Sequence, residues 1–337
     1  RDRLLLLASF TYHRLALQRE KASLNPVGQM VSVNGHDMSV FVKGEGPQTL
    51  VFLSGAGTAS PILDFKDLYD GFSKQYKIVV VERAGYGYSE DTSKSRDVSE
   101  VLSETRQALA RAHVSGPYII LSHSMASLET LLWQEKYPSE VKAIIGLDWA
   151  LPESYSHLTI HPQILRMARW GSQLGLLRYL PSRLYVPNAN LSSSDHRLYQ
   201  RIAYRQILSK AMLNESLSVK ENAKKVTSSL DSQIPTLLMV SNGEGTGFSQ
   251  EDWRHYATSF AKDQKNIEVT FYDSPHYLYH YQTKEVAEKI EEFIKSLLNE
   301  FTYIIEERCD AHWFKSLSKL MGGLAKGLPA IAGAKAI

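Results

Sequence analysis

Short apolar runs alternate with longer segments of helical periodicity along most of the chain. The runs lie at 49–53, 77–82, 117–122, 141–147, 235–241 and 267–272, and helical spacing appears at 98–112, 127–137, 251–261 and 283–298. Residues 78–81 read Ile-Val-Val-Val, the near-continuous apolarity that a strand covered on both faces requires. Strands alternating with helices predict a parallel sheet with right-handed crossovers and helices on both faces.

Two further β-type runs, at 29–33 and 37–43, precede this alternation and are separated by a short turn. The turn contains Asn34-Gly35, a pair that favours the type I′ turn of a hairpin because its twist matches that of the flanking strands. An antiparallel hairpin followed by six parallel strands predicts an α/β fold with an eight-stranded, mostly parallel sheet.

The alternation stops after the sixth strand. Residues 152–232 contain no strong strand, and apolar side chains such as Ile164, Met167 and Leu174 recur at helical spacing. We therefore expect a helical cap at 152–232, inserted into a core made of 29–151 and 233–300.

The two ends of the chain differ from this pattern. Residues 1–28 include Leu4-Leu5-Leu6-Leu7 and predict either an amphipathic helix over 4–21 that packs on the core or the remnant of a membrane anchor. Residues 301–337 predict the end of a helix and a basic amphipathic tail, which could bind a membrane surface or a partner, or could simply fray. No run reaches the roughly 20 apolar residues of a membrane-spanning helix.

Composition narrows the classes of function. The 337 residues are 43% hydrophobic and 22% charged, typical of a folded globular chain, and a net charge of +2 gives no field that would attract nucleic acid. The single cysteine, Cys309, excludes an intrachain disulfide framework and a cysteine-based metal cluster. Gly85-x-Gly87 lacks the third glycine of a dinucleotide fingerprint, and no histidine–carboxylate motif has metal-ligand spacing. No cofactor or metal is implied.

Ser124 lies where a strand would turn into a helix, within Ser122-His123-Ser124-Met125-Ala126. A serine on such a turn projects its hydroxyl from the sheet edge, and the amide that follows it faces any oxyanion formed there. The turn needs small residues two positions before and after the serine, a condition that Ser122 and Ala126 meet. Ser124 could instead be a helix N-cap, a common role for serine.

The segment resembles the nucleophile elbow of the α/β-hydrolase superfamily, Gly-x-Ser-x-Gly, with both glycines replaced. Two further segments are similar to that family. Ser54-Gly55-Ala56-Gly57 follows a strand as its oxyanion loop does, and residues 82–89, Glu-Arg-Ala-Gly-Tyr-Gly-Tyr-Ser, resemble its Asp-Arg-x-Gly-x-Gly-x-Ser turn. The resemblance implies an oxyanion hole made by the amides of Ala56 and Met125, with Gly55 beside them.

The general base predicted by the same resemblance is His276, on the loop after the last strand. His280 is a competitor, although its place near the next helix favours a packing role. Two carboxylates fit as the third member of a triad: Asp148 ends the sixth strand, and Glu244 follows the seventh. We favour Glu244, because most family members place the acid there, and keep Asp148 as the alternative.

These residues together predict a serine hydrolase, similar to carboxylesterases and lipases, that cleaves an ester or similar acyl bond of a small, partly apolar molecule. Aromatic residues near the cap favour an apolar substrate group: Trp149, Tyr155, Trp170 and Tyr179. One alternative is a ligand sensor that keeps the fold, signals to a partner and turns over little. Another is a membrane-surface lipase that uses the basic tail or an N-terminal anchor.

Overall fold

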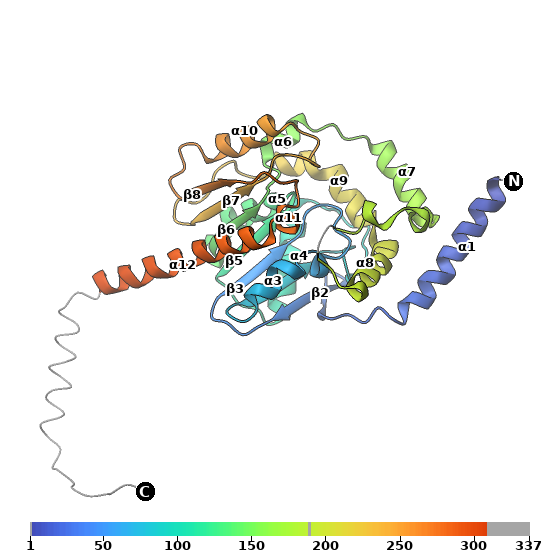
Figure 1. The fold of residues 1–337 in the computed structure, drawn as a ribbon, viewed down its shortest axis with the longest axis horizontal. Coiled ribbons are helices and arrows are strands. Elements are labelled where there is room, and N and C mark those ends of the chain that lie inside the picture. Colours follow the sequence, from blue (N-terminus) through green and yellow to red (C-terminus); the bar gives the residue numbers. More distant parts are fainter. Residues whose placement is uncertain (1, 188–189, 309–337) are drawn as a thin grey trace, which may run out of the picture. The chain divides into compact units, whose positions relative to one another are not determined.

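The computed structural model describes residues 2–187 and 190–308 (Figure 1). The predicted basic tail at 311–337 and Cys309 lie outside the described residues. Residues up to Ala287 form one compact unit, and Glu288 begins a second. The first unit contains all of the candidate site residues.

One eight-stranded sheet forms the centre of this unit, with strand order β1-β2-β4-β3-β5-β6-β7-β8. β1 pairs with β2, and β2 with β4, in antiparallel fashion, and all the other neighbours are parallel. The strands are β1 (Gln29–Val33), β2 (His36–Lys43), β3 (Thr49–Leu53), β4 (Lys77–Glu82), β5 (Tyr118–His123), β6 (Val141–Leu147), β7 (Thr236–Val240) and β8 (Ile267–Phe271). The predicted eight-stranded, mostly parallel sheet is confirmed, and Asn34 and Gly35 both have positive φ in the hairpin turn.

Both faces of the central strands are buried, as their continuous apolarity requires. Val51 and Leu53 of β3 join one core cluster with residues of the helices that connect β4 to β6 and β7 to β8. Phe52, between them, points to the other face and packs on Phe65 and Tyr69, with ring centroids 5.3 and 6.3 Å away. The helices of the core are α2 (Pro61–Asp64), α3 (Lys66–Phe72), α4 (Val98–Arg111), α5 (Ala126–Lys136), α10 (Gln250–Ala261) and α11 (Leu278–Tyr281). The last described helix, α12 (Thr283–Arg308), begins in this unit and contains the boundary with the second.

A helical insert follows β6. It consists of α6 (Pro152–His157), α7 (Pro162–Gln173), the short 3₁₀ helices η2 (Leu176–Tyr179) and η3 (Ser182–Leu184), α8 (Ser193–Gln206) and α9 (Lys210–Ala223). Local signals explain where the long helices begin: proline opens α7, and the hydroxyls of Ser192 and Ser209 cap α8 and α9. Figure 1 shows α6, α9 and α7 along one side of the sheet, at the top of the view.

α1 (Asp2–Lys21) is the helix expected near the N-terminus, but its leucines do not pack on the core. Leu4 to Leu7 are 43–71% exposed, whereas the buried residues of this helix are Ser9 and His13. The expectation of an amphipathic helix that buries its apolar side is therefore wrong. Within the part of the chain that the structure describes, no helix is both long and apolar enough to cross a membrane.

Candidate active site

Ser124 occupies the turn between β5 and α5, at the carboxyl edge of the sheet. Its φ is +51°, in the left-handed region that side chains other than glycine rarely adopt. Such strain persists only where the surroundings impose it, and here the Ser124 amide donates to the carbonyl of Leu147 at the end of β6. The backbone geometry is that of a strained strand-to-helix turn, which holds the hydroxyl away from the strand.

Ser122 and Ala126 occupy the positions of the two glycines of the elbow, and both fit there as buried residues. Ser122 is fully buried, and its hydroxyl oxygen accepts hydrogen bonds from Thr130 Oγ1 at 2.8 Å and Trp149 Nε1 at 2.9 Å. A buried hydroxyl costs little when its hydrogen bonds are made. Ala126 is 2% exposed at the first turn of α5. Trp149, which we expected near a substrate, therefore stabilises the turn through its hydrogen bond to Ser122.

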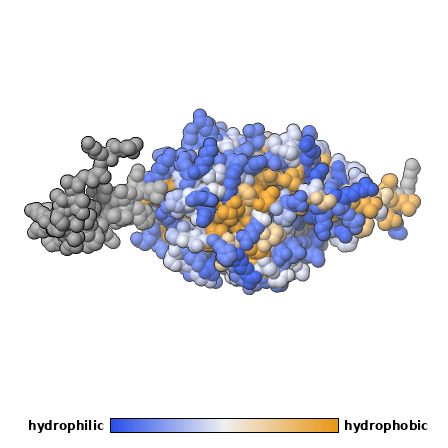
Figure 2. All heavy atoms as spheres, turned by 90° about the horizontal axis from the view of Figure 1, so that it is seen from below, coloured by the Kyte–Doolittle hydropathy of each residue, from blue (hydrophilic) through white to orange (hydrophobic). Residues whose placement is uncertain are grey.

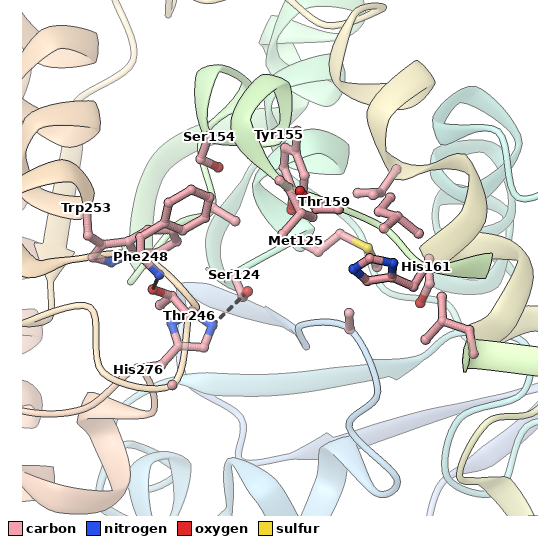
Figure 3. A pocket seen from close by; sticks show the side chains of 18 of the residues that line it. Ser124, Met125, Ser154, Tyr155, Thr159, His161, Thr246, Phe248, Trp253 and His276 are labelled. Carbon is pink, nitrogen blue, oxygen red and sulfur yellow. Dashed lines mark hydrogen bonds between the residues drawn. The ribbon is translucent and has the colours of Figure 1, made fainter. Parts of the chain in front are cut away.

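His276 links the serine to a carboxylate. Its Nε2 lies 2.8 Å from Ser124 Oγ (Figure 3), and its Nδ1 lies 2.6 Å from Asp148 Oδ2. His280 takes no part in these hydrogen bonds with Ser124 and Asp148, because its Nε2 contacts the carbonyl and carboxylate of Asp64. The structure thus brings the predicted Ser124 and His276 together from two loops that lie 152 residues apart.

The acid beside His276 is Asp148, which corrects our preference for Glu244. Asp148 is fully buried, and Oδ1 accepts from the amide of Ser241 at 2.7 Å and from Trp253 Nε1 at 2.8 Å, while Oδ2 faces His276. A positive φ of +48° directs its side chain after the end of β6. Trp253 was not predicted from the sequence, because nothing in its local pattern distinguishes it from a core tryptophan of α10.

Glu244 contacts the same histidine through its backbone instead. Its carbonyl accepts from the His276 amide at 2.9 Å, while its side chain is exposed to solvent. The loop after β7 therefore positions the main chain of His276, and the Glu244 carboxylate takes no part in the hydrogen-bonded chain. Position in the sequence could not distinguish the two acids, since both follow neighbouring parallel strands and end at the same edge.

The glycine loop after β3 lies against the elbow. A Cβ on Gly55 would meet His123 Nδ1 at 2.8 Å and Ser124 Cβ at 2.9 Å, so only glycine fits there. Ala56 and Met125 both line the pocket that contains Ser124. The backbone of the loop at Gly55 therefore packs directly against His123 and Ser124.

Arg83, in the segment 82–89 that resembles the family's glycine-rich turn, joins this loop to the cap. Its guanidinium donates to the carbonyl of Ser54 at 2.8 Å and to Glu215 of α9 at 3.2 Å. Tyr86 also donates to Glu215, at 2.6 Å, and its hydroxyl accepts from the Gly57 amide at 3.3 Å. Arg83 and Glu215 are 2% and 3% exposed, so this ion pair is shielded from water and fixes α9 over the loop.

His123 is a second histidine that the sequence analysis left unassigned. It is fully buried, and its ring centroid lies 4.6 Å from that of His276. Burial, and to a smaller extent the charge of the nearby His276, lower the pKa of His123 well below the usual range. The ring is therefore neutral, and its Nε2 lies 3.3 Å from the carbonyl of His276. The residue before the serine thus supports the backbone of the loop that carries the base.

A pocket of about 510 Å³ opens above Ser124, between the sheet edge and the cap (Figure 3). Its wall is mostly apolar or aromatic, and it includes residues of α6, the segment before α7, the loop after β7, and α10: Tyr155, Leu158, Ile160, Phe248 and Trp253. The volume and the apolar lining are those of a small-molecule site. Of the cap aromatics expected near a substrate, Tyr155 lines this pocket, whereas Trp170 and Tyr179 are 71% and 64% exposed.

No cluster of three or more histidine, cysteine, aspartate or glutamate side chains with the geometry of a metal site occurs in residues 2–187 and 190–308. The polar groups in contact with Ser124 and its neighbours are instead linked as hydrogen-bond donors and acceptors, from the Ser124 hydroxyl through His276 to Asp148. The chemistry that this geometry can perform is activation of a hydroxyl by a neighbouring imidazole.

Other proteins are similar to this chain in sequence, and others in fold. The chain is 34% identical over 313 residues to the uncharacterized protein YbdG of Bacillus subtilis, covering 87% of this chain and 94% of that protein. No protein-family model matches it.

Solved structures resemble the fold at much lower identity. An epoxide hydrolase from Bacillus megaterium superposes with a TM-score of 0.60 at 18% identity, covering 79% of this chain and 100% of that one. The esterase EaEST from Exiguobacterium antarcticum gives a TM-score of 0.60 at 14% identity, covering 80% and 99%. The chain therefore belongs to the same family as YbdG, and its sheet order and the helical insert after β6 are those of the α/β-hydrolase fold.

Proposed function

We propose that the protein is a serine hydrolase that cleaves the ester or a similar acyl bond of a small, partly apolar molecule. The observation that carries the proposal is the hydrogen-bonded chain from Ser124 through His276 to Asp148 beneath an apolar pocket of about 510 Å³. A serine hydroxyl is a weak nucleophile unless a base lies within hydrogen-bond reach, and here the distance to that base is 2.8 Å.

In the first step, Ser124 Oγ attacks the acyl carbon while His276 Nε2 takes the hydroxyl proton. For Nε2 to act as the acceptor, the neutral ring must carry its proton on Nδ1, which then donates to Asp148 at 2.6 Å. The Ser241 amide and Trp253 also donate to the same carboxylate, so its orientation is fixed before the reaction starts. Asp148 thereby sets the tautomer and stabilises the imidazolium that forms.

The negative charge of the tetrahedral intermediate needs donors at the position of the carbonyl oxygen. The amides of Ala56 and Met125 are our candidates, because both residues line the pocket beside Ser124, and Met125 precedes the N-terminus of α5. His276 then gives its proton to the leaving alcohol, and the same histidine activates the water that releases the acyl group.

The test is hydrolysis of p-nitrophenyl esters with acyl chains of two to about twelve carbons. The parent chain should turn over many times with a preference set by the apolar pocket, and Ser124→Ala should lose activity by about 10⁴-fold or more. Release of a single nitrophenolate per protein molecule, with no further turnover, would favour the ligand-sensor alternative. Equal activity of the parent and Ser124→Ala would refute the proposal.

A further inference from the structure

Helix α7 borders the active-site pocket, which its Ile164 and Leu165 line, and it is held to the rest of the cap by polar residues. Arg169 donates to the carbonyl of Leu208, and Ser172 donates to that of Ile207 at 3.0 Å, so these two polar residues hold the helix to the turn between α8 and α9. Arg169 and Ser172 are three positions apart and therefore lie on one side of the helix. A surface helix usually buries its apolar side and exposes its polar side.

Three large apolar residues of the same helix are exposed to solvent, whereas Leu165 is half-buried beside the pocket. Ile164, Met167 and Trp170 recur at three-residue spacing and are 61%, 71% and 71% exposed. The segment that follows continues this pattern, with Tyr179 64% and Leu184 65% exposed in η2 and η3. Solitary exposed apolar residues are ordinary, but a succession of large ones along one segment marks a contact surface.

Helix α1 adds a second group of exposed apolar residues and is joined to the same segment of the cap. Ser9 donates to the carbonyl of Leu174 at 2.7 Å, and Arg178 of η2 pairs with Glu20 at 2.7 Å. These contacts hold α1 beside η2 while leaving its N-terminal leucines in solvent. In Figure 2 they form the apolar end of the molecule next to the grey N-terminal residue. We refer to α1 and residues 164–184 together as the apolar cap face.

The charge of this segment is uniform. Between Glu153 and Asp195 the sequence contains four arginines and no lysine, aspartate or glutamate. The arginines are Arg166, Arg169, Arg178 and Arg183. Arg169 and Arg178 contact Leu208 and Glu20, so Arg166 and Arg183, which are both exposed, are the cations of this segment that can meet an anionic surface. Exposed leucine, tryptophan and tyrosine side chains beside such arginines are typical of helices in a lipid interface, where apolar side chains enter the acyl region and cations bind anionic headgroups.

The apolar cap face is continuous with the active site. Ile164, exposed on α7, also lines the pocket above Ser124. Leu184 of η3 lines a second pocket, of about 440 Å³, that reaches His276 from the other side of the loop after β3. Residues of the apolar cap face therefore line both pockets that reach His276.

We propose that the apolar cap face binds the surface of a bilayer that contains anionic phospholipid, and that the substrate of the proposed hydrolase enters the pocket from that bilayer. The binding is independent of catalysis, whereas the route of the substrate rests on the proposed function. Esters whose acyl chain partitions into a membrane are the substrate class that this arrangement favours.

The binding test is sedimentation of the full chain with vesicles of phosphatidylcholine and phosphatidylglycerol, at low and high salt. The parent should sediment with the vesicles, less so at high salt. Replacing both Met167 and Trp170 by glutamine should weaken binding at least tenfold, because both side chains are 71% exposed and would lose their apolar burial in the acyl region. The matched control, Val42→Gln with Phe271→Gln, changes two apolar side chains of the sheet that are 42% and 43% exposed, and should bind as the parent does.

Three results would overturn the inference: no sedimentation of the parent, equal loss in the control variant, or a parent dimer in the ultracentrifuge that the Met167/Trp170 variant converts to a monomer. The Ser124→Ala variant separates this inference from the proposed function. It should bind vesicles like the parent while remaining inactive. A further assay compares hydrolysis by the parent of esters embedded in vesicles with hydrolysis of the same esters in detergent. If both proteins bind vesicles but the parent hydrolyses the embedded esters no faster, the surface binds lipid and the proposed route of the substrate is wrong.

Discussion

The sheet side and the cap side of the active site differ in which side chains they bury. The sheet side buries hydrogen-bonded polar groups, whereas the cap side leaves large apolar groups in solvent. On the sheet side, Asp148 and Ser122 are fully buried, and each accepts hydrogen bonds from side chains of other elements. On the cap side, α7 uses its polar residues for internal contacts and leaves Met167 and Trp170 71% exposed.

The difference indicates two separate requirements. Catalysis by a serine needs groups fixed to within a fraction of an ångström, and a buried network without spare donors supplies that rigidity. The cap needs only to cover the pocket, so its outer apolar side is available for another surface. The sheet wall should therefore tolerate almost no substitution, and the cap wall should tolerate many.

The largest difference is expected between two carboxylates. Asp148→Asn should reduce kcat by about 10⁴-fold, because an amide in that place no longer holds His276 in the correct tautomer. Glu244→Gln, which changes an exposed side chain on the neighbouring loop, should stay within about twofold of the parent. Steady-state kinetics on one ester measures both, and a larger loss in Glu244→Gln would restore the acid that the sequence favoured.

Two glycines offer a matched comparison of the walls. Gly55→Ala places a Cβ within 2.9 Å of His123 and Ser124, so the elbow must move, and a displacement of about 1 Å can cost 10²-fold in kcat. Gly171→Ala in α7 meets only a leucine methyl at 3.5 Å and should leave kcat unchanged while stabilising the helix by up to about 1 kcal/mol. Similar kinetics for the two variants would show that the elbow is less constrained than its contacts indicate.

Burial at the end of β4 should appear as a pH dependence of stability. Glu82 is fully buried, and burial raises its pKa from 4.5 to about 7, although the Tyr88 amide donates to it at 2.8 Å. The folded state therefore holds this proton more tightly than the unfolded state. The contribution is complete below pH 4.5 and is lost as the pH rises through about 7.

Relative to Glu82→Gln, the parent should lose roughly 3 kcal/mol of unfolding free energy over that range. Urea unfolding of both proteins at pH 4.5 and pH 8 measures the difference. Parallel pH profiles would mean that the carboxyl group is not kept protonated by burial.

The smallest expected effect concerns two serines. Ser122→Ala removes one of the two acceptors of Thr130 and one of the two acceptors of Trp149, and should cost about 1 kcal/mol of unfolding free energy. Ser156→Ala in α6 removes an exposed hydroxyl that donates to Glu153, and should change stability by less than about 0.5 kcal/mol. Equal losses in urea unfolding would remove this part of the contrast.

The sequence predicted the sheet and the cap well because their signals are local. Strand positions followed from apolar runs such as residues 78–81, and the elbow from a serine placed between a strand and a helix. Its limits appeared where a long-range arrangement decides. Periodicity showed that α7 has an apolar side, but not that Arg169 and Ser172 would hold the opposite side inward.

The acid shows the same limit. Asp148 and Glu244 end neighbouring strands, and only the direction of the backbone at Asp148, with φ of +48°, together with the donors from Ser241 and Trp253, distinguishes them. Both donors come from parts of the chain far from Asp148 in sequence, so no local pattern could have revealed them.

The central claim is that His276 and Asp148 make Ser124 the reactive group. Labelling with a fluorophosphonate, followed by mass mapping of the modified peptide, tests it directly. The parent should carry one adduct, on Ser124, Asp148→Asn should react far more slowly, and Ser124→Ala should carry none. An adduct on another residue, or equal labelling of Ser124→Ala, would contradict the claim.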